Sequence, residues 1–387
     1  MKKNIMDLYT ERVKRFSDVI SGVQPDKVPV LALIDNWAIY NAGYSLMDII
    51  NDLEKHAYAY EKVLQDFQWD ATFFEGLPTP MQLLNDLGGS TYRITESIQI
   101  ESGSALCMED SEYPQLTKDP YKFIRDIIFP RKYDLLKGHM DDETYRKITT
   151  ALTDLEKFNA MKSNNKRLFK EKYGMPVPRK TSIFHPTDLL LDFLRDFNGI
   201  ILDVKRRPDQ VLEASMAMLP LCLDVIDLFT ADASQGEVIF MPMHLPQFLK
   251  PKDFEKVYWP AYKKIVEHAN KKDCKILCYF ESKYEHLYEY LLDLPKNSII
   301  GLFEKDDMIK AKKILGNHMC IAGGMETNLL QYGTSQECID HAKKMVDHLA
   351  PGGGYIFTTD LILHSQNDGS PENIKAVNDF VFEYGIY

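Results

Sequence analysis

The sequence predicts an α/β protein built as a single (β/α)₈ barrel. Short β-type runs alternate with helical stretches along most of the chain, a pattern typical of βα units and a parallel sheet. Seven or eight such units can be traced, and no GxGxxG or GxxxxGK[ST] motif occurs, which favours a closed barrel over a nucleotide-binding sheet. An open doubly wound sheet is the alternative. The length of 387 residues fits either one elaborated barrel or two to three domains.

The N-terminal part supplies a helical arm and the first two βα units. An amphipathic helix is expected over residues 6–22, followed by an apolar run over 28–35 that ends in a carboxylate. A long helical stretch over 46–66 leads to a second short run, 69–76, which ends in an acid and a glycine.

The middle of the chain has a different composition. Residues 115–180 are rich in Lys, Asp, Glu and Tyr, and their prolines are spread out. We interpret this stretch as a helical and loop insertion between barrel elements, not as a separate domain, so that residues 1–387 form one barrel domain. Helices are expected to follow at 186–197 and 208–230.

The C-terminal half shows the alternation most clearly. Five short apolar runs are predicted as strands, at 237–244, 274–281, 298–304, 318–326 and 354–360. Helices are expected between them at 252–271, 283–292, 307–315 and 335–349, and a last helix begins near Pro371. Thr334 and Glu337 have the spacing of a capping box.

Composition excludes several classes of protein. A hydrophobic fraction of 45% with 11% aromatic residues excludes a disordered chain. A net charge of −11 argues against a nucleic-acid or anionic-membrane binder. No apolar stretch approaches the roughly 18 residues of a membrane span, and the six cysteines form no CxxC pair. We therefore expect a cytoplasmic protein with reduced thiols, bound to neither membrane nor nucleic acid.

Polar residues close most of the predicted strands. In a (β/α)₈ barrel the C-terminal strand ends meet at one mouth, so these side chains are expected to gather there. Each alone is as often a helix cap or a solvated loop residue, but a ring of acids with two histidines suits a metal or acid–base site. The set comprises Asp35, Glu75, His244, Glu281, Glu304, Glu326 and Asp360, with His364 shortly after the last strand.

Aromatic residues cluster near the same strand ends and are candidates to line a pocket for a flat apolar ligand. For any single ring, packing in the barrel core is the commoner role. The set is Trp37, Tyr40, Tyr44, Phe73, Phe74, Phe240, Tyr279, Phe280 and Phe303.

Seven short segments, in this order and spacing, carry a family resemblance. They lie at 11–13, 25–30, 249–254, 259–262, 329–334, 352–356 and 371–377. With them the chain resembles the uroporphyrinogen decarboxylase superfamily, which also contains corrinoid-dependent methyltransferases. The resemblance spans nearly the whole chain, is weakest in the middle, and implies a single (β/α)₈ barrel.

The branch of the family is indicated by motifs that this sequence lacks. Decarboxylases of this family carry an Arg-rich segment after the first strand, but residues 34–44 contain no arginine. An acid-ringed mouth would also repel a polyanionic tetrapyrrole. The His-x-Cys and late Cys that hold zinc in coenzyme M methyltransferases are absent as well, and carboxylates stand near those positions.

The chain is instead most similar to the demethylating methyltransferases of O-demethylase systems. That resemblance implies transfer of a methyl group from a methoxylated aromatic, a phenyl methyl ether, to the Co(I) corrinoid of a partner corrinoid protein. Zinc or a proton donor on the ether oxygen would stabilise the leaving phenolate. The insertion at 115–180 is the first place to look for docking of the corrinoid protein. A homodimer is left open.

The resemblance and the strand ends together assign roles to candidate residues. Zinc is predicted on Glu281, Glu304 and His364, with His244, Glu326 and Asp360 as catalytic acid–base groups or alternative ligands. The substrate is predicted to contact Asp35, Trp37, Tyr40, Phe74, Glu75 and Phe280. The alternatives are a decarboxylase, a methyltransferase for a methylamine or methylthiol, and a non-catalytic binding subunit.

Overall fold

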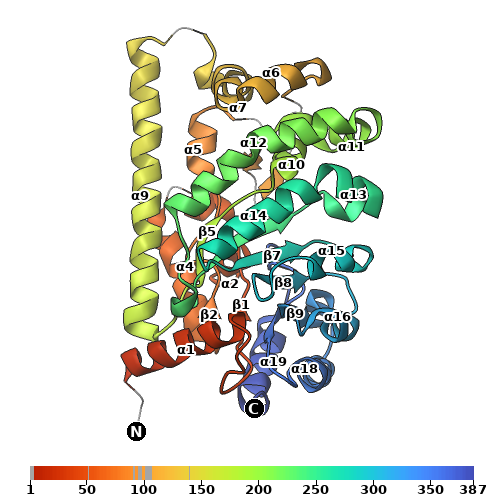
Figure 1. Ribbon diagram of the computed structural model, residues 1–387. Coiled ribbons are helices and arrows are strands. Elements are labelled where there is room, and N and C mark those ends of the chain that lie inside the picture. Colours follow the sequence, from red (N-terminus) through yellow and green to blue (C-terminus); the bar gives the residue numbers. More distant parts are fainter. Residues whose placement is uncertain (1–3, 51, 90–91, 95–97, 101–106, 139) are drawn as a thin grey trace.

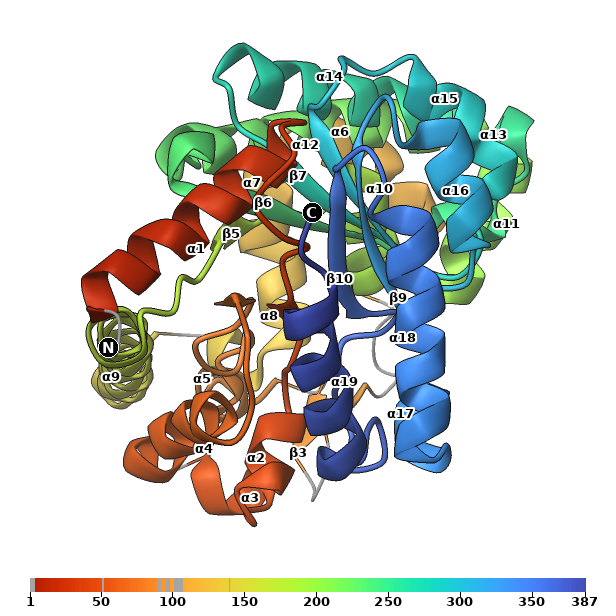
Figure 2. The same cartoon turned by 90° about the horizontal axis from the view of Figure 1, so that it is seen from below.

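Parallel strands lie at the centre of the molecule and helices surround them (Figure 1, Figure 2). The computed structural model describes residues 4–50, 52–89, 92–94, 98–100, 107–138 and 140–387. Among these residues, no helix combines the length and the apolar character that crossing a membrane requires. The α/β class that the sequence predicts is confirmed.

Most of the barrel wall is one parallel sheet of six strands, in the order β10-β9-β8-β7-β6-β5. The strands are β5 (Arg179–Ser182), β6 (Val238–Met243), β7 (Ile276–Phe280), β8 (Ile299–Phe303), β9 (Cys320–Met325) and β10 (Tyr355–Thr359). Strands β6 to β9 are buried along their whole length, as expected for a parallel sheet that is covered on both faces.

The first two strands complete the wall between β10 and β5. Strand β1 (Leu31–Ala32) pairs in parallel with β2 (Ala71–Thr72). Isolated parallel bridges, Val30 with Phe357 and Ile34 with Leu363, join the first strand to the β10 side. On the other side, the Thr72 N–H donates to the Pro176 carbonyl at 3.1 Å. Single bridges and hydrogen bonds, not regular ladders, therefore connect this part of the barrel.

Helices on the outside follow the strands in chain order, and Figure 2 shows α14, α15, α16 and α18 outside β7 to β10. The Thr334–Glu337 capping box forms at the start of α18, as the sequence predicts. The helices are α10 (Pro186–Leu189), α11 (Asp196–Arg206), α12 (Pro208–Leu228), α13 (Pro251–Val257), α14 (Trp259–Lys271), α15 (Tyr288–Leu292), α16 (Met308–Leu315), α17 (Thr327–Tyr332), α18 (Ser335–Leu349) and α19 (Pro371–Tyr384).

The N-terminal arm and the insertion lie on the other side of the barrel. Helix α9 (Asp142–Tyr173) runs along one side of the molecule and ends beside α1 (Ile5–Ile20) (Figure 1). Arg12 of α1 donates to the carbonyls of Tyr173 and Gly174 at 2.8 and 3.0 Å, and fixes this contact. Between them in sequence lie α2 (Trp37–Asn41), α3 (Leu46–Ile49), α4 (Leu53–Asp66), α5 (Met81–Asp86), the hairpin β3 (Tyr92–Ile94) and β4 (Ile98–Ile100), α6 (Tyr113–Lys118), α7 (Pro120–Phe123) and α8 (Phe129–Lys132).

Several local expectations differ from the structure. The helix expected over 252–271 is divided into α13 and α14, and the helix expected over 283–292 is the short α15 preceded by a 3-10 turn. Strand β5 was not predicted and overlaps the end of the stretch assigned to the insertion. Its sequence, Arg-Lys-Thr-Ser, has no apolar run that would mark it as a strand. The helix expected over 46–66 is two helices, α3 and α4. The helix expected to end at residue 197 instead passes through a π-helical segment, Leu190–Arg195, and continues as α11 to Arg206.

A buried ion cluster fastens α1 to the start of the barrel. Arg15 donates to Asp70 and to Asp26, each at 2.6 Å, and Lys27 lies 3.3 Å from Asp70. The other oxygen of Asp70 accepts the Val30 N–H at 3.0 Å, next to β1. Because Arg15 and Asp70 are 5% and 1% exposed, their charges depend on each other.

We expect Asp70→Ala to lower the free energy of unfolding by about 3 kcal/mol, because it leaves buried cations and the Val30 N–H without a partner. The control is Asp18→Ala, which removes the ion pair of Asp18 with Lys14, a largely exposed residue, on α1 and should cost less than about 1 kcal/mol. Urea unfolding of the three proteins measures the difference; equal losses would contradict the role of this cluster.

Candidate functional site

A large cavity lies at the C-terminal ends of strands β1, β2, β5 and β6. Its volume is about 1110 Å³, and helices α8 and α9 of the insertion contribute to its wall. Its position is the one at which (β/α)₈ barrels carry their active sites. The charged and aromatic residues that line it include Asp35, Phe74, Glu75, Lys132, Lys162, Lys166, Arg179, Lys180, Phe184, Phe193, Phe240, His244 and His364.

Cationic side chains outnumber carboxylates on this wall. The lining cations are Lys132, Lys162, Lys166, Arg179 and Lys180, whereas the lining carboxylates are Asp35 and Glu75. The acid-ringed mouth that the sequence analysis expects is therefore wrong for this cavity. Several of the predicted acids point elsewhere, and the cations come from β5 and from the insertion, where the analysis placed no site residue.

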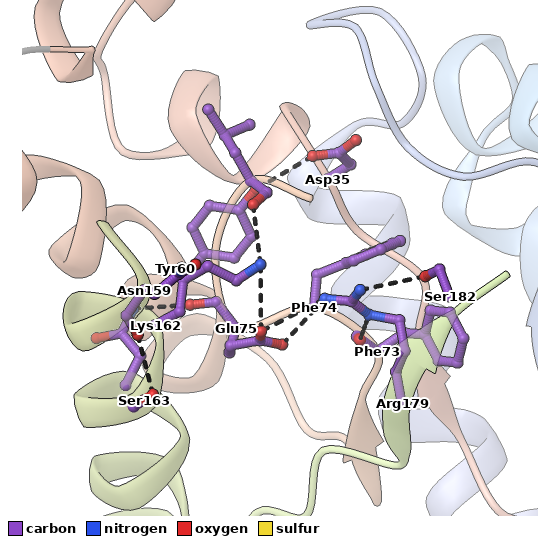
Figure 3. Close-up of polar contacts among 12 residues, drawn as sticks. Asp35, Tyr60, Phe73, Phe74, Glu75, Asn159, Lys162, Ser163, Arg179 and Ser182 are labelled. Carbon is purple, nitrogen blue, oxygen red and sulfur yellow. Dashed lines mark hydrogen bonds and ion pairs between the residues drawn. The ribbon is translucent and has the colours of Figure 1, made fainter. Parts of the chain in front are cut away.

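Glu75 joins three parts of the wall. It follows β2, and its carboxylate lies 3.3 Å from Arg179 of β5 and 3.3 Å from Lys162 of α9 (Figure 3). The Arg179 guanidinium also donates to the Phe73 carbonyl at 3.3 Å and stacks over the Phe74 ring at 5.0 Å. The strand ends and the insertion are thus held in one arrangement by a single shared carboxylate.

Asp35 lies at the end of the first strand region and is 5% exposed. Tyr60 of α4 donates its hydroxyl to one oxygen at 3.2 Å, and His364 Nδ1 lies 3.1 Å from the other. This contact joins the loop after β10 to the loop after β1, so a predicted substrate residue and a predicted metal ligand bind each other.

His244, directly after β6, is held between two carboxylates. Its Nδ1 lies 2.8 Å from Asp192 in the π-helical segment, and its Nε2 lies 3.1 Å from Glu281 at the end of β7. Burial lowers the pKa of His244, but the hydrogen bonds to Asp192 and Glu281 outweigh it and raise the pKa to about 11. The imidazole is therefore charged at neutral pH, and both of its N–H groups are directed at carboxylates in the folded protein.

Aromatic rings form the wall next to His244. Phe184 packs edge to face on Phe193, with centroids 5.7 Å apart, and its centroid lies 6.5 Å from that of His244. Phe240 of β6 packs on Phe73 at 5.2 Å. These rings offer flat apolar surface to an aromatic ligand, which the sequence analysis expected from a partly different set.

The predicted substrate residues divide into two groups. Asp35, Phe74 and Glu75 line the cavity. Trp37 instead donates its indole N–H to the Gly369 carbonyl at 2.9 Å, and Phe280 packs between Tyr284 and Phe303 in the buried core. Tyr40, on α2, is not among the residues that line the cavity.

The predicted metal and acid–base residues are also dispersed. Glu281 binds His244, whereas Glu304 accepts the Ser282 N–H at 2.7 Å. Asp360 accepts the Thr327 N–H at 2.9 Å, and Glu326 is exposed at the start of α17.

Within the described ranges, no three His, Cys, Asp or Glu side chains are grouped to hold a metal ion. The set Glu281, Glu304 and His364 is therefore not assembled in this structure, and we derive no step through a zinc ion. Zinc binding by these residues stays a prediction.

Sequence reasoning missed the cations and two of the rings. Arg179 stands in the unrecognised strand, Lys132, Lys162 and Lys166 lie in the insertion, and Phe184 and Phe193 flank α10. One sequence signal could have indicated strand β5: the polar run Arg179–Ser182 stands directly before the apolar pair Ile183-Phe184. A barrel strand whose end faces a cavity need not be apolar.

A neutral histidine supports the loop that carries Glu75. His56 of α4 accepts the Leu77 N–H on Nε2 at 3.0 Å and packs against Tyr60 and Phe158. Burial, with the nearby charge of Lys162, lowers the pKa of His56 to about 3. The ring therefore stays an acceptor at neutral pH and holds the loop in place.

Comparison with known proteins agrees with the barrel. The family described as uroporphyrinogen decarboxylase (URO-D) matches residues 167–384, more than half of the chain. Among solved structures, a methyltransferase from Methanosarcina mazei superposes with a TM-score of 0.65 at 13% identity, over 96% of this chain and 98% of that one. No curated protein matches the sequence.

The low pKa of His56 predicts a pH dependence of stability. The unfolded ring takes up a proton near pH 6.5 and the folded ring only near pH 3, so the contribution of His56 to stability is present above pH 6.5. It falls by about 1.4 kcal/mol per pH unit as the pH drops from 6.5 towards 3.

The test is urea unfolding at pH 7.0 and 5.5, in which His56→Gln should lose less stability than the wild type, because an amide oxygen can accept the Leu77 N–H without titrating. His348→Gln, on an exposed helix surface, is the control and should keep the wild-type pH dependence. The same pH slope in His56→Gln and the wild type would show that His56 does not cause it.

Proposed function

Because the chain belongs to the uroporphyrinogen decarboxylase family, we propose that it is a methyltransferase acting on a methoxylated aromatic. The methyl acceptor in this proposal is the corrinoid of a partner protein, which supplies a Co(I) nucleophile. The observation that carries the proposal is the cavity itself, where aromatic rings and a doubly hydrogen-bonded imidazole face the same space. The likeness in fold to a methyltransferase supports it.

The chemical problem is a poor leaving group. When the methyl carbon of a phenyl methyl ether is attacked, the C–O bond breaks and its electron pair moves to the phenolate oxygen. A hydrogen-bond donor at that oxygen stabilises the developing charge and so lowers the barrier.

His244 is the side chain placed to do this. Asp192 fixes its ring through Nδ1, and in our proposal Nε2 exchanges its bond with Glu281 for one with the ether oxygen when the substrate enters. Phe184 and Phe193 hold the aromatic ring beside it. His244 keeps its proton, the phenolate leaves with the electron pair of the broken C–O bond and is protonated by water, and the Nε2–H then donates to Glu281 again.

The charge of the wall discriminates between methyl donors. A methylamine is a cation at neutral pH, and the excess of lysine and arginine on the wall would repel it. A neutral or anionic aromatic ether meets no such repulsion. The cavity therefore favours the aryl ether over the methylamine alternative.

The same basic wall favours one second candidate. A decarboxylase of the family needs cations for the carboxylates of its substrate, and β5 and the insertion supply them although residues 34–44 contain no arginine. Release of CO₂ without a corrinoid acceptor is the activity that would identify this candidate.

Purified protein mixed with methoxybenzoates and free cob(I)alamin should methylate the corrinoid, which is followed by the loss of Co(I) absorbance. We expect His244→Asn to lower kcat by about 100-fold or more, because the leaving phenolate loses its donor. His268→Gln alters an imidazole paired with Asp227 on the surface and should keep the wild-type rate.

Two results would contradict the proposal: CO₂ release from these acids without methyl transfer, or an unchanged kcat in His244→Asn. Metal analysis of the wild type, Glu281→Ala and His364→Ala in the same preparations tests the separate prediction of zinc.

A further inference from the structure

Lys132, at the end of α8, is a buried cation on the wall of the cavity. Its side chain is 6% exposed. Its Nζ donates to the Phe193 carbonyl at 3.4 Å and lies 4.6 Å from the centroid of the Phe193 ring. No carboxylate within the described residues forms an ion pair with it.

Three other cations of this wall have a carboxylate partner. Lys162 and Arg179 share Glu75, each at 3.3 Å. Lys180 is paired with Glu237 at 3.2 Å and is more exposed. Among the described residues, Lys132 has a long hydrogen bond to a carbonyl, the face of a ring and the more distant charge of Asp192, but no carboxylate in contact, although an ammonium taken out of water needs a counter-charge.

The residues around Lys132 indicate which kind of anion could bind next to it. Phe193, whose ring and carbonyl both contact Lys132, packs edge to face on Phe184. Phe184 in turn lies next to His244, with centroids 6.5 Å apart. A positive charge, two rings and a proton donor therefore follow one another along the same wall.

We propose that Lys132 binds the carboxylate of an aromatic acid, whose ring lies against Phe193 and Phe184 and whose methoxy group faces His244. This inference rests on the proposed function and names its substrate class as methoxylated aromatic carboxylates. The carboxylate supplies the contacting counter-charge that Lys132 does not find among the described residues, and its charge-assisted hydrogen bond to Lys132 fixes the direction in which the ring enters.

Burial also lowers the pKa of Lys132, and a bound carboxylate raises it again, so ligand and protonated lysine stabilise each other. Lys166 of α9 lines the same cavity and forms no ion pair with a described carboxylate, so it adds a second positive charge to the field that an anion meets on entry.

The test compares acids with neutral molecules of nearly the same shape. Isothermal titration calorimetry measures the dissociation constants of 2-, 3- and 4-methoxybenzoate and of the three matching methoxybenzamides, without a corrinoid acceptor. The wild type should bind at least one acid about tenfold or more tightly than its amide. Lys132→Met should abolish this preference and leave the affinity for the amide unchanged.

Lys180→Met is the matched control, since it removes a lysine of the same cavity that Glu237 already neutralises. It should keep the preference for the acid. Lys132→Met removes a buried charge without a counter-ion, so we expect it to fold, with a thermal midpoint no lower than that of the wild type.

Equal binding of acid and amide by the wild type, a preserved preference in Lys132→Met, or failure of all six compounds to bind would overturn the proposal. Acid-selective binding that depends on Lys132 but leads to no methyl transfer would keep this carboxylate site and refute the proposed function. Methyl transfer from the amides that is as efficient as from the acids would keep the proposed function and refute the carboxylate site at Lys132.

Discussion

The carboxylate of Glu75 is the point at which the barrel and its insertion are joined. It accepts Arg179 from β5 and Lys162 from α9 while standing directly after β2. Two largely buried cations, one on α9 and one on the following strand β5, are therefore neutralised by one group from β2, which helps to fix the cavity wall. His56 supports the same loop from α4 through the Leu77 N–H. Two further hydrogen bonds from α9 reach this loop: Asn165 donates to the Glu75 carbonyl at 2.9 Å and Lys162 to the Leu77 carbonyl at 3.2 Å.

The distribution of charge inside the cavity has a chemical consequence. Because Glu75 is shared and Asp35 is paired with His364, the acids of the wall are already used within the protein. Lys132 forms no ion pair with a described carboxylate and lies next to rings that suit a flat ligand. The net charge of −11 belongs to the chain as a whole, whereas the cavity has the opposite character. An anionic aromatic substrate follows from that local balance and not from the overall composition.

Much of the fold could be predicted, because long apolar strands and capped helices leave periodic patterns. Strand β6 and the Thr334–Glu337 capping box are examples. Strand β5 could not be found in this way, since its residues are polar and one of them, Arg179, serves the cavity.

The candidate site was predicted only in part, for a related reason. The end of a strand indicates where a side chain begins but not what it contacts. His244, Asp35 and Glu75 do line the cavity, whereas Glu304 and Asp360 accept backbone N–H groups and Phe280 packs in the core. Lys132 lies in the insertion, which carried no recognisable motif.

The most direct test of the proposed binding mode is a crystal structure with a bound methoxybenzoate. We expect its carboxylate on Lys132, its ring against Phe193 and its methoxy group at His244; a carboxylate bound at His244, or a ligand outside this cavity, would contradict the proposed binding mode.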